Sequence, residues 1–385
     1  MLKLKLSLRK AFVVVSSFCL FANIWLLIHI TRKKRTEIHN EPKLIIASVI
    51  FRHGDRNPTR TFPTDPNRDV SWPEGRSALT QIGVEQAYEL GAYLRRRYAS
   101  LLGDGPHSDD IVYVQSSKQS RTLITGAICL AALLFPSKKD QILNRDLSWQ
   151  SLPIYTVSKE EDYILYHGKK CQRYERAFDE YLESPEFTAL MARHKKMFRQ
   201  LQKRSGMEIN TFHDAKRLYN VLWIEKLQNK TLPAWGIEAL ENDDFKRVVG
   251  QTYQLKTNTT LLARLHSGFF IREILESLQQ KINGTLSPDR SLFLYSASGN
   301  TIAKVLNALG LFDVRAPPYA SSLHFEVYSS NDEYHMQIIY RNTDDENPCP
   351  LEIPSCGAKC SLEQFKSIYS TIIPTGTFDE ECELS

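Results

Sequence analysis

Runs of apolar residues predict the strands of this chain. Residues 44–51 (LIIASVIF) are almost continuously apolar and rich in β-branched side chains, which is typical of a strand buried on both faces of a parallel sheet. Residues 111–115 (IVYVQ) and 291–297 (SLFLYSA) have the same character, and an apolar helical pattern follows each of them. This alternation of strands and helices indicates an α/β fold, with a mostly parallel sheet core and flanking helices.

The residue composition of the chain changes in its middle third. This stretch is dense in Tyr, Glu, Lys and Arg at helical spacing and has no clear buried strand, so it predicts a helical cap on the sheet domain. Two late strands follow, separated by Asn331-Asp332, a hairpin signal. We therefore expect a core formed by 42–148 and 290–385 and a cap formed by 149–289. The sequence has no internal repeat, which excludes a solenoid.

The N-terminal segment 1–36 contains a candidate membrane span. Residues 11–31 carry no charge and are long enough to cross a ~30 Å hydrocarbon core at ~1.5 Å per residue. A cleaved signal peptide is the alternative, but the nearest cleavage candidate, Leu20-Phe21-Ala22, has a bulky residue where a small one is needed. We expect a retained signal-anchor. The Arg-Lys-Lys-Arg run directly after the span also resembles a site of proteolytic release.

The basic net charge belongs to this segment. The chain has 385 residues, of which 42% are apolar, and a formal net charge of +5 from 49 basic and 44 acidic residues. Residues 1–36 hold eight basic residues and no acidic one, which leaves 41 basic against 44 acidic residues in the remainder. A nucleic-acid binder with a basic stripe on its folded body is therefore disfavoured.

Sequons and cysteines indicate the compartment of the body, because the equal basic flanks of the span do not. Asn229, Asn258 and Asn283 each begin a glycosylation sequon, and six cysteines lie outside the span. We expect the body to be luminal or extracellular, in a type II membrane protein or a secreted one. Cys356 and Cys360 suit a tight disulfide loop, or half of a zinc site that lacks a second ligand pair. We expect no metal.

The first predicted strand ends in Arg52-His53-Gly54-Asp55-Arg56. Ligands of open α/β sheets bind at the carboxyl ends of strands, so this position is a candidate site. Guanidinium groups match phosphate oxygens, and a histidine among them can act as a nucleophile or as an acid or base. The two cations also favour the neutral imidazole, which is the attacking form. The alternative, an ordinary basic turn with a solvated histidine, is disfavoured by the buried strand in front of it.

Several segments share their motifs with one family. The chain resembles the histidine acid phosphatases, in particular the prostatic and lysosomal acid phosphatases, over nearly everything after residue 42. The resemblance is carried by RHGDRNPTRTFPTDP (52–66), SWPEGRSALTQIGVEQAYELGAYLRRRY (71–98), SRTLITGAICLAALLFP (120–136), LYSA (294–297), PPYASSLHFEVY (317–328) and YRNTDDENPCPLEIPSCGAKC (340–360).

The resemblance implies a mechanism for phosphate monoesters. His53 would attack phosphorus and become a transient phosphohistidine. Arg52, Arg56 and Arg121 would bind the phosphate oxygens. The family uses no metal or other cofactor.

The resemblance also implies structure beyond the site. It implies a phosphoglycerate-mutase-like core with a helical cap, and a possible homodimer formed through the core sheet. It implies that Cys171 pairs with Cys382 and that Cys356 pairs with Cys360.

One departure affects catalysis. Family members carry a His-Asp dipeptide after the third strand, in the context YSAHDTT, whereas this chain reads YSASGNT at 295–301. Ser298 therefore replaces the phosphate-contacting histidine, and Gly299 replaces the aspartate that protonates the leaving group. A His213-Asp214 dipeptide occurs in the predicted cap and is interpreted as a coincidence.

Two hypotheses about function follow. The first is a phosphomonoesterase with impaired turnover, which works best on substrates with acidic leaving groups such as aryl phosphates. The second is a pseudoenzyme that binds a phosphorylated ligand without turning it over.

A second departure concerns cysteines. The family's third disulfide would join the positions of Ile224 and Ser322, so the whole bridge is absent. Cys129, on an apolar helix, is expected to be a small buried hydrophobe rather than a reactive thiol. Cys349 has no obvious partner.

Overall fold

The computed structural model describes residues 42–384, except 104–107, 136–151, 332 and 344. The predicted span at 11–31 lies outside these residues. Within the described ranges, every helix is too short or too polar to cross a membrane.

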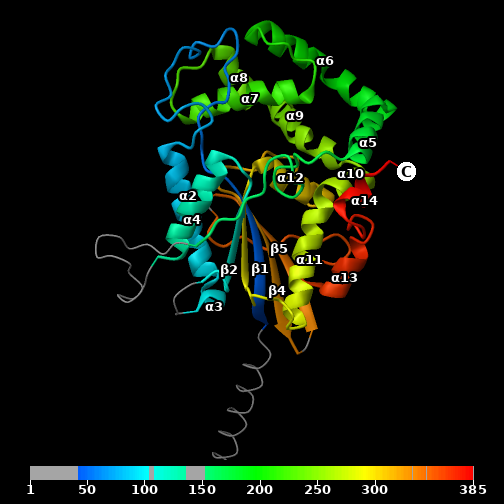
Figure 1. The fold of residues 1–385 in the computed structure, drawn as a ribbon. Helices are drawn as coiled ribbons and strands as arrows, with labels where there is room; N and C mark the ends of the chain where they lie inside the picture. Colours follow the sequence, from blue (N-terminus) through cyan, green and yellow to red (C-terminus); the bar gives the residue numbers. More distant parts are fainter. Residues whose placement is uncertain (1–41, 104–107, 136–151, 332, 344, 385) are drawn as a thin grey trace, which may run out of the picture. The chain divides into compact units, whose positions relative to one another are not determined.

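A mixed six-stranded sheet forms the centre of the structure (Figure 1). Its strands are β1 (Lys43–Arg52), β2 (Val112–Ser116), β3 (Leu292–Ala297), β4 (Ser322–Ser330), β5 (Glu333–Arg341) and β6 (Cys360–Ser361). Their order is β2-β3-β1-β4-β5-β6. Strands β1 and β2 both pair with β3 in parallel, whereas β5 and β6 are antiparallel. Asn331, between β4 and β5, has φ 52°, which suits the tight turn predicted there. The predicted α/β class is confirmed.

Helices cover both faces of this sheet. Leu292 and Leu294 of β3 pack with residues of α2 (Gln81–Arg97) and α4 (Ser120–Leu133) in one apolar core. Tyr295, on the opposite face of the same strand, contacts Phe270 of α11 (Phe269–Ile282) with ring centroids 5.1 Å apart. Figure 1 shows α2 and α4 on one side of the strands and α11 on the other. The shorter helices of this part are α3 (Ala99–Leu102), α12 (Gly299–Ala308), α13 (Leu362–Ile368) and α14 (Phe378–Cys382).

A second group of helices surrounds a separate apolar core. These helices are α5 (Gln172–Glu183), α6 (Pro185–Ser205), α7 (Phe212–Leu227), α8 (Ala234–Glu241) and α9 (Asp243–Gln254). Phe198, Leu218 and Phe245 are buried in this second core. In Figure 1 these helices lie beyond the carboxyl end of β1. We call them the cap helices. The division at residues 149 and 289 stays a prediction, and α11, inside that range, packs on the sheet.

Two disulfides are present. Cys171–Cys382 joins the residue before α5 to the end of α14, across a sequence separation of 211. Cys356–Cys360 closes a short loop. These are the pairings that the resemblance implied.

The remaining positions singled out from the sequence have simple environments. Cys129 is buried and unpaired, and Cys349 is exposed and unpaired. The three sequon asparagines Asn229, Asn258 and Asn283 are all exposed, so a glycan is sterically possible at each, and glycosylation stays a prediction.

Candidate active site

The ends of three strands bring the candidate residues together. Arg52, the last residue of β1, is paired in register with Ala297, the last residue of β3. The His53 backbone N–H donates to Ala297 O at 3.1 Å, and the Arg52 N–H donates to Ser321 O at 2.9 Å. Ser116, the last residue of β2, pairs with Ser296 of β3. The loops after β1, β2 and β3 therefore meet at one edge of the sheet, next to the segment that enters β4.

Close backbone packing fixes the loop that carries the motif. A Cβ atom at Gly54 would lie 2.2 Å from Gly83 O, so only glycine fits between this loop and α2. The Asp55 carboxylate accepts a hydrogen bond from the Thr80 hydroxyl at 2.7 Å, and Thr80 is the N-cap of α2. Burial raises the pKa of Asp55. The glycine and the aspartate thus hold the loop against the first turn of α2.

His53 is held as a neutral imidazole. Its side chain is 3% exposed, and Nδ1 is 2.8 Å from Gly54 O. Because a carbonyl oxygen can only accept, Nδ1 carries the proton and Nε2 keeps its lone pair. Burial lowers the pKa of His53 well below its ordinary value, and the charges of Arg52 and Arg121 lower it further. The site therefore presents an unprotonated Nε2, as a nucleophile requires.

Three guanidinium groups act on this histidine. The Arg52 guanidinium lies 3.9 Å from the centroid of the Tyr319 ring and donates to Pro317 O. Arg56 donates to Asn57 O at 2.8 Å. Arg121 lies in the first turn of α4, and burial, Arg56 and Arg52 together lower its pKa to about 10.

The hydrogen bonds of this cluster are incomplete. The Nε atoms of Arg52 and Arg121 are buried without a partner among the described residues. The charges of Arg52 and Arg56 act on Arg121, and the ion pairs of the described residues join none of the three to a carboxylate. A bound phosphate dianion would supply both the missing acceptors and the missing negative charge.

The position of the missing dipeptide lies at the start of α12. Ser298 is the N-cap residue of this helix, and its hydroxyl is 3.3 Å from Thr301 Oγ1. Gly299 is the first helical residue, and a Cβ atom at this position would lie 3.0 Å from Arg52 Cδ. Backbone N–H groups at such a helix start favour an anion. The segment therefore lies beside the arginines, although it brings no titratable side chain to them.

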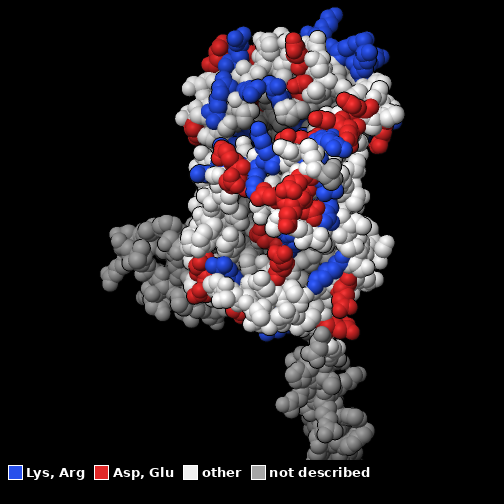
Figure 2. All heavy atoms as spheres, turned by 45° about the vertical axis from the view of Figure 1, so that its right-hand side comes forward, with Lys and Arg blue, Asp and Glu red and all other residues white. Residues whose placement is uncertain are grey.

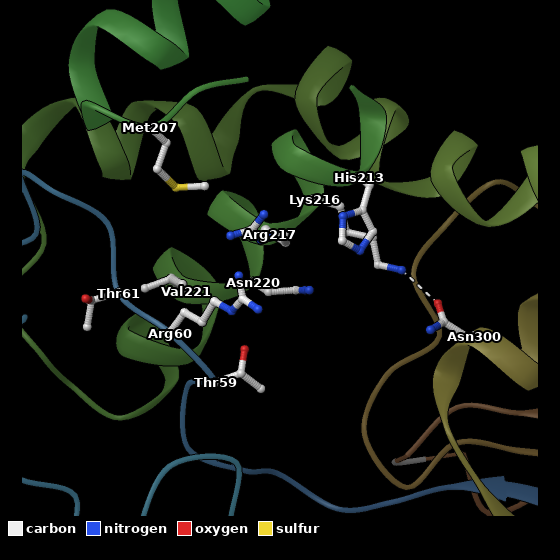
Figure 3. Close-up of a pocket in the computed structure, with 10 residues that line it drawn as sticks. All are labelled: Thr59, Arg60, Thr61, Met207, His213, Lys216, Arg217, Asn220, Val221 and Asn300. Carbon is white, nitrogen blue, oxygen red and sulfur yellow. Dashed lines mark hydrogen bonds between the residues drawn. The ribbon is translucent and has the colours of Figure 1, made fainter. Parts of the chain in front are cut away.

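A basic cavity of about 400 Å³ is lined by the loop after β1, by α7 and by the start of α12 (Figure 3). Its polar wall is formed by Arg60 from the loop after β1, by His213, Lys216 and Arg217 from α7, and by Asn300 from α12. Figure 3 shows the Lys216 ammonium bonded to Asn300, and the distance from Nζ to Oδ1 is 2.7 Å. We call this space the basic pocket. Figure 2 shows Lys and Arg side chains gathered around a hollow on the face turned to the viewer, with Asp and Glu side chains below it.

The two residues of the His213-Asp214 dipeptide have different environments. The Asp214 carboxylate accepts from the backbone N–H of Thr211 at 3.1 Å and completes a capping box at the start of α7. His213 is exposed and lines the basic pocket. The aspartate is therefore engaged as a helix cap.

The structure places the four sequence-predicted site residues, His53, Arg52, Arg56 and Arg121, in one electrostatically coupled cluster. Sequence reasoning did not find Tyr319, Lys216, Asn300 or Arg60. The described residues contain no group of three or more His, Cys, Asp and Glu side chains arranged to hold a metal ion.

Comparison with known proteins gives one consistent result. The family model for the histidine phosphatase superfamily (branch 2) matches residues 43–341. The prostatic acid phosphatase of Rattus norvegicus is 36% identical over 341 residues, covering 86% of this chain and 87% of the relative. The lysosomal acid phosphatase of Homo sapiens is 30% identical over 351 residues, covering 89% and 81%.

Solved structures support the fold. The phytase of Hafnia alvei in complex with tartrate has a TM-score of 0.65 at 17% identity, covering 89% of this chain and 99% of the phytase. The phytase of Citrobacter braakii has a TM-score of 0.64 at 18% identity, covering 89% and 100%. At these identities the likeness concerns the fold alone.

Proposed function

Because the chain belongs to the histidine phosphatase superfamily (branch 2), we propose that it hydrolyses phosphate monoesters through a phosphohistidine on His53. The observation that carries this proposal is the protonation state of His53. Nδ1 is tied to Gly54 O, and Nε2 is left to attack a phosphorus atom bound by Arg52, Arg56 and Arg121. The test is hydrolysis of an aryl phosphate by the wild type and by His53→Ala, with loss of turnover expected in the variant.

Turnover depends on the leaving group in this proposal. A positioned general acid contributes about 10²–10⁴-fold, and Gly299 has no side chain to supply it. The donor lost at Ser298 is worth about 2–4 kcal/mol by analogy with one oxyanion donor, although the two losses are not additive. Aryl phosphates, whose phenolates leave without a proton, should therefore be better substrates than alkyl phosphates.

A second candidate function is a pseudoenzyme that binds phosphorylated ligands. The observation in its favour is that the arginines and His53 form the cluster described above while Ser298 and Gly299 lack both side chains of the dipeptide. Hydrolysis of an aryl and an alkyl phosphate, with and without the double change Ser298→His and Gly299→Asp, separates the two functions. Aryl turnover by the wild type supports the enzyme. Turnover only in the double variant supports the pseudoenzyme.

The location of the body is part of the proposal. Its relatives are named prostatic and lysosomal acid phosphatases, and the chain has two disulfides and three exposed sequons. These features favour a luminal or secreted body, held to the membrane by the span at 11–31 as a type II protein or released by cleavage. N-terminal sequencing of secreted material tests release, and a start near Thr36 would support processing at the basic run. A homodimer is also proposed, and light scattering tests it.

A further inference from the structure

Lys216 is hydrogen-bonded to Asn300, the residue that follows the position of the missing acid. Its Nζ atom donates to the side-chain carbonyl of Asn300 at 2.7 Å (Figure 3). Asn300 follows Gly299, the position of the family's proton donor, and a Cβ atom at Gly299 would lie 3.0 Å from Arg52 Cδ. Adjacent Cα atoms are ~3.8 Å apart. Lys216 is therefore anchored to the first turn of α12, next to Gly299. The ammonium group reaches this place from α7, a cap helix.

The surroundings of Lys216 favour loss of its proton. The ammonium group lies 3.7 Å from the centroid of the Tyr253 ring, and no carboxylate of the described residues forms an ion pair with it. Burial lowers the pKa of Lys216 to about 7, and Arg52 and Arg56 contribute to the shift. A lysine with such a pKa can donate a proton near neutral pH and take it back, which an ordinary lysine cannot do.

The charged and titratable groups around Lys216 come from every element that packs near it. They are Arg52 from the end of β1, Arg56 and Arg60 from the loop after it, His213 and Arg217 from α7, Tyr253 from α9, Lys256 just after α9, and Lys304 from α12. All of them are basic or neutral, so each cation among them favours the neutral amine. Only an anion entering the pocket would reverse this.

We propose that Lys216 is the proton donor to the leaving group, in place of the aspartate that Gly299 replaces. The inference rests on the proposed function. His53 Nε2 attacks phosphorus, the bond from phosphorus to the leaving oxygen breaks, and its electron pair stays on that oxygen. A proton moves from Lys216 Nζ to the leaving oxygen, so a neutral alcohol departs. Water then attacks the phosphohistidine, one of its protons returns to Lys216, and hydrogen phosphate is released.

His213 is the competing donor in the same pocket. It lines the wall beside Lys216, but burial and the charges of Lys216 and Arg217 lower the pKa of its imidazole. His213 is therefore neutral where Lys216 is still protonated. Its imidazole also lacks a hydrogen bond to α12, whereas Lys216 is anchored there. The geometry favours the lysine, and a His213→Gln variant tests the choice.

The experiment compares kcat/KM for a series of phosphate monoesters whose leaving groups range from p-nitrophenol to simple alcohols. Lys216→Gln should lower kcat/KM for the alkyl phosphates about 10-fold or more and for p-nitrophenyl phosphate several-fold less. Lys216→Arg keeps the positive charge but does not release a proton, so it should show the same selective loss. The alkyl activity of the wild type should fall above pH ~7, and this limb should be absent in Lys216→Arg.

A control variant and the His213→Gln variant separate a proton-donor role of Lys216 from other effects of its replacement. Lys246→Gln removes a lysine of the cap helix α9 that forms an ion pair with Asp243 and lines neither this pocket nor the arginine cluster, so it should leave the ratio of aryl to alkyl rates unchanged. Equal losses on all substrates in Lys216→Gln, restoration of alkyl turnover by Lys216→Arg, or selective loss in His213→Gln instead would overturn the role of Lys216. In each of those cases aryl hydrolysis by the wild type would still support the proposed function. Absence of aryl hydrolysis in the wild type would refute both.

Discussion

Gly299 lies directly against Arg52, so that a Cβ atom at Gly299 would be 3.0 Å from Arg52 Cδ and 3.2 Å from its Nε. The Arg52 side chain therefore leaves little room for a side chain at position 299, which the resemblance gives as the family's acid position. Arg52 is in turn held by the Tyr319 ring and by Pro317 O. A Cβ atom at position 299 would require Arg52 to move by a few tenths of an ångström.

This contact predicts the effect of the smallest possible side chain. Gly299→Ala should displace the Arg52 guanidinium and raise the inhibition constant of inorganic phosphate by about 3–10-fold, because a hydrogen bond to a charged group is weakened. The matched control is Gly126→Ala in α4, whose Cβ would meet no atom closer than 3.5 Å. Equal inhibition constants for Gly299→Ala and the wild type would show that Arg52 adjusts without cost.

Arg121 should contribute strongly to phosphate affinity. Its Nε is buried without a partner in the part of the chain that the structure describes, and burial together with Arg56 and Arg52 lowers its pKa, so a bound dianion relieves both costs. We expect Arg121→Gln to raise the inhibition constant of phosphate by about 10–100-fold. Arg176→Gln, which removes an exposed ion pair with Glu180 on α5, should have no effect. Similar constants for the two variants would place Arg121 outside the phosphate site.

The protonation of His53 gives a prediction about pH. Burial and the arginine charges depress the pKa of its imidazole, so the neutral form should persist when the pH falls through the ordinary histidine range near 6.5. Nitrogen chemical shifts of labelled histidine, followed against pH, should show His53 unprotonated at pH 5.5. In Arg121→Gln the pKa should rise, because one repelling charge is removed. A titration of His53 near 6.5 in the wild type would contradict this environment.

The long-range disulfide should stabilise the fold without affecting chemistry. Cys171–Cys382 closes a loop of 211 residues between α5 and α14. Replacing both cysteines by serine should lower the free energy of unfolding by about 2–4 kcal/mol, measured by denaturant titration. The kcat for an aryl phosphate should not change at temperatures where both proteins are folded. A large loss of kcat under those conditions would indicate that the bridge also positions the cap helices.

The motif loop was predictable because its residues are contiguous. A buried strand followed by Arg52-His53-Gly54 already places a histidine and an arginine at a sheet edge. Strand β6 was less accessible, since its two residues are too few for a period-two pattern. The packing of α11 was also not predictable, because the apolar pattern of a helix does not indicate whether its apolar face packs on a sheet or on other helices.

The basic pocket could not be predicted for a different reason. Lys216 and Asn300 are 84 positions apart and meet only because α7 lies over the start of α12. In a sequence, a lysine within a helix dense in charged residues has the pattern of a solvated face. The capping role of Asp214 has a local sequence signal, because Thr211 lies three residues before it. That signal explains the aspartate, but it carries no information about the neighbouring His213 and Lys216.

The most direct test of the central claim is chemical trapping of the phosphoenzyme. The protein is mixed with an aryl phosphate, quenched in alkali after milliseconds to seconds, and digested for mass spectrometry under conditions that preserve phosphohistidine. We predict a phosphoryl group on His53 that forms as fast as the phenol is released and is absent from His53→Ala. Phenol release without phosphate on His53, or with phosphate on another residue, would contradict it.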